Sequence, residues 1–328
     1  MKRRLRITAI ILSLMIPIAM LSGCNRTTGP ENGRIGVVCT VFPQYDWVRR
    51  ILGDRVDSMD LTLLLKSRID LHSYQPSVDD IAKISVCDLF IYVGGESDGW
   101  VGDALKDTAN KNMVVINLLD TLGNMVREEE ILEGMEDEEP EADEADGGGI
   151  GYDEHVWLSL RNAQVLCTAI ANVLASLDAD NAGEYQSNLA AYIAKLQALD
   201  EEYKKAVNAA PVRTLLFGDR FPFRYMMDDY GLTPYAAFSG CSAETEASFD
   251  TIVFLARKVD ELGLNTVMVT ESADQSIART IIANTKDKNQ QILVLDAMQS
   301  VTSSDVRNGT TYLSIMESNL DVLKEALR

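Results

Sequence analysis

Two histidines are the only imidazoles in the 328-residue sequence, and each lies in a short polar stretch with the composition of a metal site. His155 lies in residues 153–157 (Asp-Glu-His-Val-Trp), and His72 lies in residues 70–77 (Asp-Leu-His-Ser-Tyr-Gln-Pro-Ser). Neutral imidazole is the commonest metal ligand among protein side chains. A histidine beside a tryptophan is also typical of a hydrogen-bonded structural residue, so the 153–157 stretch alone leaves both interpretations open.

The elements that must position these histidines are apolar strand patterns alternating with helical ones. This alternation is typical of a parallel sheet with both faces covered. Ligands of such sheets bind in the loops at the carboxyl ends of the strands, and His72 lies in such a loop. The expected strands are 34–42, 58–65, 88–93 and 113–118 in the first half, and 213–217, 235–238, 266–270 and 292–295 in the second.

A long helical pattern separates the two halves. Apolar side chains recur at helical spacing from residue 182 to residue 209, and Pro211 ends the pattern. At 1.5 Å per residue such a helix is roughly 40 Å long, which is more than one small domain needs. We therefore expect an N-terminal α/β lobe at 34–180, a connecting helix at 181–210 and a C-terminal α/β lobe at 211–328.

The N-terminus has the composition of an export signal. Basic residues at 2–6 precede an apolar stretch at 7–21, which is shorter than the about 20 residues that span a membrane. The Leu-Ser-Gly-Cys sequence at 21–24 resembles a bacterial lipobox. This resemblance implies a lipoprotein signal peptide at 1–23, acylation of Cys24, and a location outside the cytoplasm on the outer face of the cell membrane. Polar residues 24–33 then form a tether; an ordinary signal peptide with an incidental cysteine is the alternative.

Charge excludes one class of partner. The net charge is −20, whereas nucleic-acid binding requires a basic surface. Twelve of the nineteen residues from 128 to 146 are Asp or Glu, and three glycines follow. Such a segment has too few apolar groups to offset the entropy of ordering, so we expect a disordered acidic insertion at 128–149. It is either a solvated loop or a weak collector of cations.

The four cysteines beyond Cys24 form no Cys-x-x-Cys pair, which excludes a zinc-ribbon or thioredoxin-like motif. Cys39, Cys87 and Cys167 lie in apolar runs and are expected to be buried thiols. The sequence leaves open whether any two cysteines form a disulfide.

Several motifs occur in order along residues 34–328. They are 38–43 (Val-Cys-Thr-Val-Phe-Pro), Gly53-Asp54, 72–77, 88–94 with Trp100, 153–157 and Tyr230-Gly231-Leu232. Together they resemble the substrate-binding lipoproteins of bacterial zinc and manganese ABC transporters. The resemblance implies two parallel-sheet α/β lobes joined by one long rigid helix, with a metal cleft between the lobes. It also implies a monomeric binding protein, not an enzyme, that delivers its metal to an ABC permease and its ATPase.

The resemblance assigns His72 and His155 as the ligands of the first lobe. The third ligand of the family lies about five residues before a tyrosine that matches Tyr225, which places it at Arg220. Because arginine stays protonated and cannot coordinate a cation, the neighbouring Asp219 is the expected ligand.

The fourth ligand of the family falls on Gln299, and Asp296 is the nearest carboxylate. Glu271 matches a family glutamate that is more often a structural acceptor. Asp70 and Asp153 are candidates for orienting the two imidazoles through their other ring nitrogens. The loop at 240–246 adds Cys241, Glu244 and Glu246 as further candidates.

Two imidazoles with one or two carboxylates suit either Zn²⁺ or Mn²⁺, and the same ligands bind zinc more tightly, so zinc is favoured. One alternative is an extracytoplasmic metal-dependent hydrolase that activates water at the histidine pair. The sequence has no His-Glu-x-x-His or Gly-x-Ser-x-Gly motif to favour that alternative. A second alternative is a family member that has lost tight metal binding, as the departures at Arg220 and Gln299 indicate.

Overall fold

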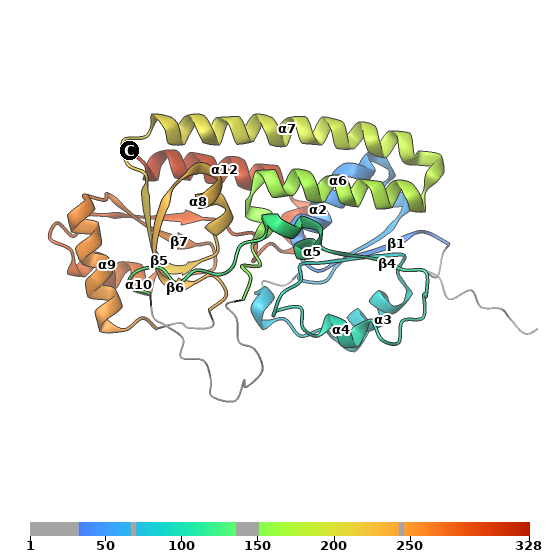
Figure 1. Cartoon of the computed structure of the whole chain (residues 1–328), viewed down its shortest axis with the longest axis horizontal. Helices are drawn as coiled ribbons and strands as arrows, with labels where there is room; N and C mark the ends of the chain where they lie inside the picture. Colours follow the sequence, from blue (N-terminus) through green and yellow to red (C-terminus); the bar gives the residue numbers. More distant parts are fainter. Residues whose placement is uncertain (1–32, 67–69, 136–150, 243–245) are drawn as a thin grey trace, which may run out of the picture.

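The computed structural model describes residues 33–66, 70–135, 151–242 and 246–328, and it contains two four-stranded sheets (Figure 1). Their strand orders are β2-β1-β3-β4 and β6-β5-β7-β8, and all strand pairs are parallel. The expected fold of two parallel-sheet α/β lobes is therefore confirmed. The strands are β1 Gly36–Cys39, β2 Asp60–Leu63, β3 Leu89–Tyr92, β4 Val114–Asn117, β5 Thr214–Phe221, β6 Thr233–Ser239, β7 Thr266–Thr270 and β8 Gln291–Leu295.

Apolar runs form the central strands because helices cover both faces of each sheet. All residues of β1 and β7 are buried. Pro43 lies in the first turn of α2, where its missing N–H costs nothing, and Gly53 follows the last turn with φ 58°. The α-helices of the described residues are α2 Phe42–Leu52, α3 Val78–Val86, α4 Val101–Ala104, α5 Leu118–Leu122, α6 Leu160–Leu177, α7 Ala182–Ala209, α8 Arg224–Tyr230, α9 Phe249–Leu262, α10 Ser276–Asn284, α11 Ser303–Arg307 and α12 Tyr312–Ala326.

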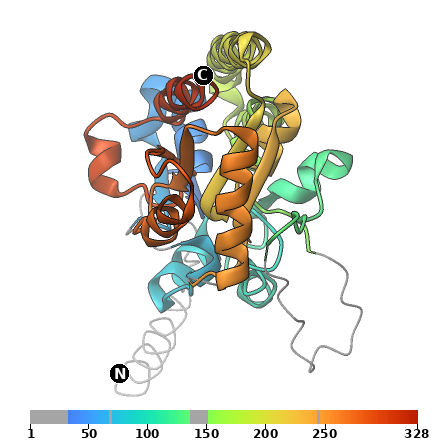
Figure 2. The ribbon, with the colours of Figure 1, turned by 90° about the vertical axis from the view of Figure 1, so that its left-hand side faces the viewer.

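The long helix α7 runs along both lobes, beside α6 of the first lobe and beside the C-terminal α12 (Figure 1). Figure 2, turned by 90°, shows α7 nearly end-on above the second lobe. Its buried face includes Tyr185, Leu196 and Tyr203, and the Tyr203 hydroxyl donates to the carbonyl of Met316 in α12 at 2.6 Å. The connecting helix thus packs into a core that residues of both lobes share.

Strand β5 is longer than predicted. The sequence pattern ended this strand at residue 217, but pairing with β6 resumes after a register shift between Phe217 and Arg220. Asp219 and Arg220 consequently lie in a strand, and the following helix α8 begins at Arg224 instead of Phe221. In the first lobe, the strand predicted at 58–65 is shorter than expected and covers Asp60–Leu63, because residues 53–58 form a 3₁₀-helix.

The acidic segment does not begin as a disordered insertion. Glu128 forms a β-bridge with Tyr152, and Glu130 and Glu133 form ion pairs with Arg224 and Lys258 of the second lobe. The composition of the segment indicated disorder because the lysine and arginine that pair with its glutamates lie far away in the sequence. The remainder of the predicted insertion, together with the signal peptide, Cys24 and nearly all of the tether, lies outside the described residues. No helix in the described ranges has the length and apolarity that a membrane span requires.

Candidate metal site

His72 is held by a single 3₁₀ turn, Leu71–Ser73, after strand β2. The Asp70 carboxylate caps this turn by accepting a hydrogen bond from the His72 backbone N–H at 3.0 Å. On the ring, Nδ1 is hydrogen-bonded to the Ser97 hydroxyl at 2.6 Å. The imidazole is therefore fixed at both its backbone and its Nδ1 side, and its Nε2 faces the space between the lobes.

His155 is fully buried and precedes a second 3₁₀ turn, Val156–Leu158. The Asp153 carboxylate accepts hydrogen bonds from the His155 backbone N–H at 2.8 Å and from its Nδ1 at 3.1 Å. This partner fixes the ring proton on Nδ1 and leaves the Nε2 lone pair for a metal ion. Asp153 is thus hydrogen-bonded to the ring nitrogen of His155 that faces away from His72.

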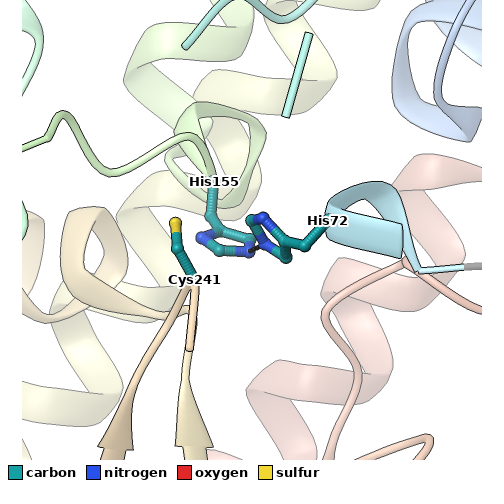
Figure 3. Close-up of side chains that lie close together, drawn as sticks. All are labelled: His72, His155 and Cys241. Carbon is teal, nitrogen blue, oxygen red and sulfur yellow. Dashed lines mark hydrogen bonds between the residues drawn. The ribbon is translucent and has the colours of Figure 1, made fainter. Parts of the chain in front are cut away.

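The two imidazoles face one another through their Nε2 atoms, which are 3.3 Å apart (Figure 3). A tetrahedral zinc ion with Zn–N bonds of about 2.0–2.1 Å separates two nitrogen ligands by about 3.3–3.4 Å. Cys241, which follows β6, lies beside the pair, and one ligand atom from each of the three residues falls within 4.8 Å of the others. The Nε2 separation matches that of two nitrogen ligands on one zinc ion, and Cys241 of the second lobe lies nearby.

A cavity of about 370 Å³ lies between the lobes next to these residues. Asp70 and His72 line it from the first lobe, whereas Asp219, Arg220 and Asp274 line it from the second. The expected cleft between the lobes is therefore present, and His72 forms part of its wall.

The two carboxylates predicted as second-lobe ligands have other partners. The Asp219 carboxylate accepts hydrogen bonds from the backbone N–H of Thr270, at 2.9 Å, and from the Thr270 hydroxyl. The Asp296 carboxylate accepts the Met298 N–H at 2.7 Å, and its pKa is raised to about 7 by burial and by the charge of Glu271. Among the described residues, the group that could hold a metal contains Cys241 in place of Asp219 and Asp296.

Glu271 does not reach the imidazoles either. Its carboxylate accepts backbone N–H groups of Ala297 at 2.8 Å, Gln299 at 2.9 Å and Ser300 at 3.2 Å. It therefore shapes the loop after β8, in agreement with the structural role that the sequence analysis favoured for it.

The two departures from the family pattern both lie at the site. Arg220 forms an ion pair with Asp70 at 2.6 Å and donates to the Ser242 carbonyl at 3.4 Å. Burial raises the pKa of Asp70, but the charges of Arg220 and His72 and the hydrogen bonds from both residues together outweigh burial, so the pKa is lowered. Gln299 donates its side-chain amide to Nε2 of His155 at 2.6 Å. Turning this amide over would present its oxygen, so Gln299 remains a candidate oxygen ligand.

The environment affects the two imidazoles in opposite directions. Burial lowers the pKa of His72 to about 4, and the neighbouring His155 acts in the same direction. Burial also disfavours the charged form of His155, but the charge and hydrogen bond of Asp153, together with the charges of Glu154 and Asp70, raise the pKa of His155. The two Nε2 atoms now contact each other, and a bound cation would coordinate both of them instead.

Cys241 and Ser97 are site residues that the sequence motifs did not assign. Cys241 entered only as one of three candidates in its loop, because no Cys-x-x-Cys or histidine spacing marks it. The four cysteines of the described ranges are all free thiols, and Cys39, Cys87 and Cys167 are buried as expected.

Replacing Asp153 by asparagine should weaken zinc binding about 10- to 100-fold, because a neutral amide no longer stabilises the Nδ1-protonated, metal-binding form of His155. A zinc titration in competition with a chromogenic chelator measures this change. Asp103→Asn is the matched control, since the Asp103 side chain is 83% exposed and forms a surface ion pair with Lys106. An affinity of the Asp153 variant within about twofold of the wild type would contradict the supporting role.

Comparisons with known proteins give relatives over nearly the whole chain. The sequence profile of the family described as "Zinc-uptake complex component A periplasmic" matches residues 37–326. Zinc-binding lipoprotein AdcA of Streptococcus pneumoniae serotype 4 is 32% identical over 90% of the chain, which spans only 56% of that relative. High-affinity zinc uptake system protein ZnuA of Bacillus subtilis is 28% identical, with 96% of this chain and 94% of the relative covered. The solved Zn(II)-bound ZnuA-like domain of S. pneumoniae AdcA is 28% identical, with a TM-score of 0.68 and coverage of 90% of this chain and 99% of the domain. The chain therefore belongs to the ZnuA family of zinc-uptake component A proteins.

Proposed function

We propose that this protein is the extracytoplasmic metal-binding component of an ABC importer, which captures a zinc ion between its lobes and delivers it to the permease. The observation that carries this proposal is the 3.3 Å separation of the His72 and His155 Nε2 atoms, which is the spacing of two ligands on one tetrahedral zinc ion. Family membership supports it, because the relatives are described by zinc binding and zinc uptake. The relatives give no support to the hydrolase alternative.

The proposal includes a lipid anchor at Cys24 on the outer face of the cell membrane. The lipobox-like sequence at 21–24 supports it, and so does the description of the S. pneumoniae relative as a lipoprotein. A monomer with this anchor would present the cleft to the permease, whose ATPase drives import.

Two measurements test the function. The purified mature chain should bind one zinc ion per molecule, measured by elemental analysis after gel filtration. Deleting the gene should lower cellular zinc and slow growth in zinc-depleted medium, and added zinc should restore growth. A protein that retains no zinc, with a deletion strain of normal zinc content, would overturn the proposal.

A further inference from the structure

We propose that Cys241 is the metal ligand contributed by the second lobe. The site would then bind through two imidazole nitrogens and one thiolate sulfur, and it would prefer thiophilic cations such as Zn²⁺, Co²⁺ and Cd²⁺ to Mn²⁺. This inference rests on the proposed function and specifies the class of ion that the same site accepts.

The backbone around Cys241 is held against the histidine pair. The Cys241 N–H donates to the Glu129 carboxylate at 2.9 Å, which ties the loop after β6 to the first part of the acidic segment. The preceding Gly240 lies so close to the site that a Cβ at this position would be 3.2 Å from Cε1 of His155 and 2.8 Å from the Phe221 carbonyl. The absence of a side chain at residue 240 therefore allows the next residue to reach the imidazoles.

The three side chains are close enough together to share one ion. Ligand atoms of His72, His155 and Cys241 lie within 4.8 Å of one another. With Zn–S of about 2.3 Å and Zn–N of about 2.0–2.1 Å, a tetrahedral ion places sulfur and nitrogen about 3.6 Å apart. Coordination therefore requires the Cys241 side chain to move toward the two Nε2 atoms, which already have the separation of two ligands on one zinc ion.

Three nearby aspartates are engaged elsewhere, whereas the Cys241 sulfur lies beside the imidazoles and can supply an anionic donor. Asp70 is paired with Arg220, and Asp153 is hydrogen-bonded to the His155 Nδ1. The Asp219 carboxylate accepts two hydrogen bonds from Thr270. The ion pair with Arg220 neutralises the Asp70 carboxylate, so Asp70 is a weaker oxygen donor for a cation in the cleft.

A second, independent observation also indicates a cation here. Glu154 is 2% exposed, and its Oε2 has no hydrogen-bond donor within the described part of the chain. This oxygen lies 3.7 Å from Nδ1 of His72, on a cavity of about 240 Å³ that Cys241 and Glu129 also line. The other oxygen of this carboxylate accepts the Ser97 N–H at 2.9 Å. A buried carboxylate oxygen without a donor is costly, and a positive charge in the adjacent site would offset that cost.

Binding is a proton exchange at sulfur. The Cys241 S–H bond breaks, the proton leaves to solvent, and the thiolate electron pair forms the bond to the incoming divalent cation. Thiolate ligands favour zinc and softer ions, whereas Mn²⁺ prefers oxygen donors. The residue at position 241 thereby sets the class of ion.

The test is cobalt spectroscopy combined with metal competition on the mature chain and its Cys241→Ser variant. Co²⁺ bound to the wild type should show a near-ultraviolet sulfur-to-cobalt charge-transfer band that the variant lacks. The variant should lose at least about 100-fold in Zn²⁺ and Cd²⁺ affinity with little change for Mn²⁺. Cys87→Ser is the matched control, because the Cys87 thiol donates to the Ile84 carbonyl away from the site. Circular dichroism checks that each variant is folded.

The outcomes separate the two proposals. A wild-type cobalt complex without the sulfur band, or a folded Cys241→Ser variant with unchanged zinc affinity, would overturn the assignment of Cys241 and leave zinc capture intact. A wild type that binds none of the ions would overturn the proposed function and this inference with it. The wild-type spectrum decides the sulfur ligand even if the variant fails to fold.

Discussion

Replacing His72 and His155 together by alanine should abolish tight zinc binding, with a loss of at least about 1,000-fold in affinity. The double variant removes both nitrogen ligands, whereas loss of a single supporting partner of a metal ligand already costs about 10- to 100-fold. Thermal unfolding with and without zinc measures the effect. Zinc at 100 times its Kd should stabilise the wild type by about 2.7 kcal/mol and should leave the double variant unchanged.

Ser73→Ala is the control for this experiment, because Ser73 lies in the same 3₁₀ turn and is exposed. Its zinc response should equal that of the wild type. The single variant His72→Ala separates loss of zinc binding from loss of folding. The His72 side chain is 11% exposed, so its removal disturbs the core less than removal of the fully buried His155. A double variant that is still stabilised by zinc as strongly as the wild type would place the metal elsewhere.

The first-lobe half of the site could be predicted from sequence because each histidine lies within a few residues of the groups that fix it. Asp70 caps the turn of His72, and Asp153 bonds to the ring of His155 two residues later. Such local contacts are visible as motifs. The strand and helix order could be predicted for the same reason, since apolar periodicity reports burial of one short segment at a time.

The second-lobe half could not be predicted because it depends on pairings between distant segments. The register shift in β5 places Arg220 beside Asp70, 150 residues earlier in the chain, and the loop after β6 brings Cys241 to the histidines. Neither contact leaves a periodic signal. Counting residues from the family pattern reached Arg220 and Gln299, so the neighbouring carboxylates Asp219 and Asp296 were the expected ligands. Backbone N–H groups of Thr270 and Met298 engage those carboxylates.

Trp157→Ala should lower the free energy of unfolding by about 3–5 kcal/mol, the range for removing a large aromatic side chain from a core. Trp157 is 1% exposed, and its ring packs 5.4 Å from the ring of His155, centroid to centroid. Its indole N–H donates to the Ala297 carbonyl of the second lobe at 2.9 Å, and its own carbonyl accepts from the Tyr312 hydroxyl at 2.7 Å. Urea unfolding followed by circular dichroism measures the change.

Phe249→Ala is the matched aromatic control, because Phe249 is 74% exposed and its loss should change stability by no more than about 0.5 kcal/mol. A free energy of unfolding of the Trp157 variant within about 1 kcal/mol of the wild type would contradict this prediction. It would mean that neighbouring side chains fill the space left by the indole. The expected large loss has a further consequence for the site. The indole bond to Ala297 joins the turn that holds His155 to the loop that carries Gln299, so its removal should also weaken zinc binding in the folded fraction. Stability and metal affinity should then decrease together, because one buried side chain connects the second lobe to the turn directly after His155.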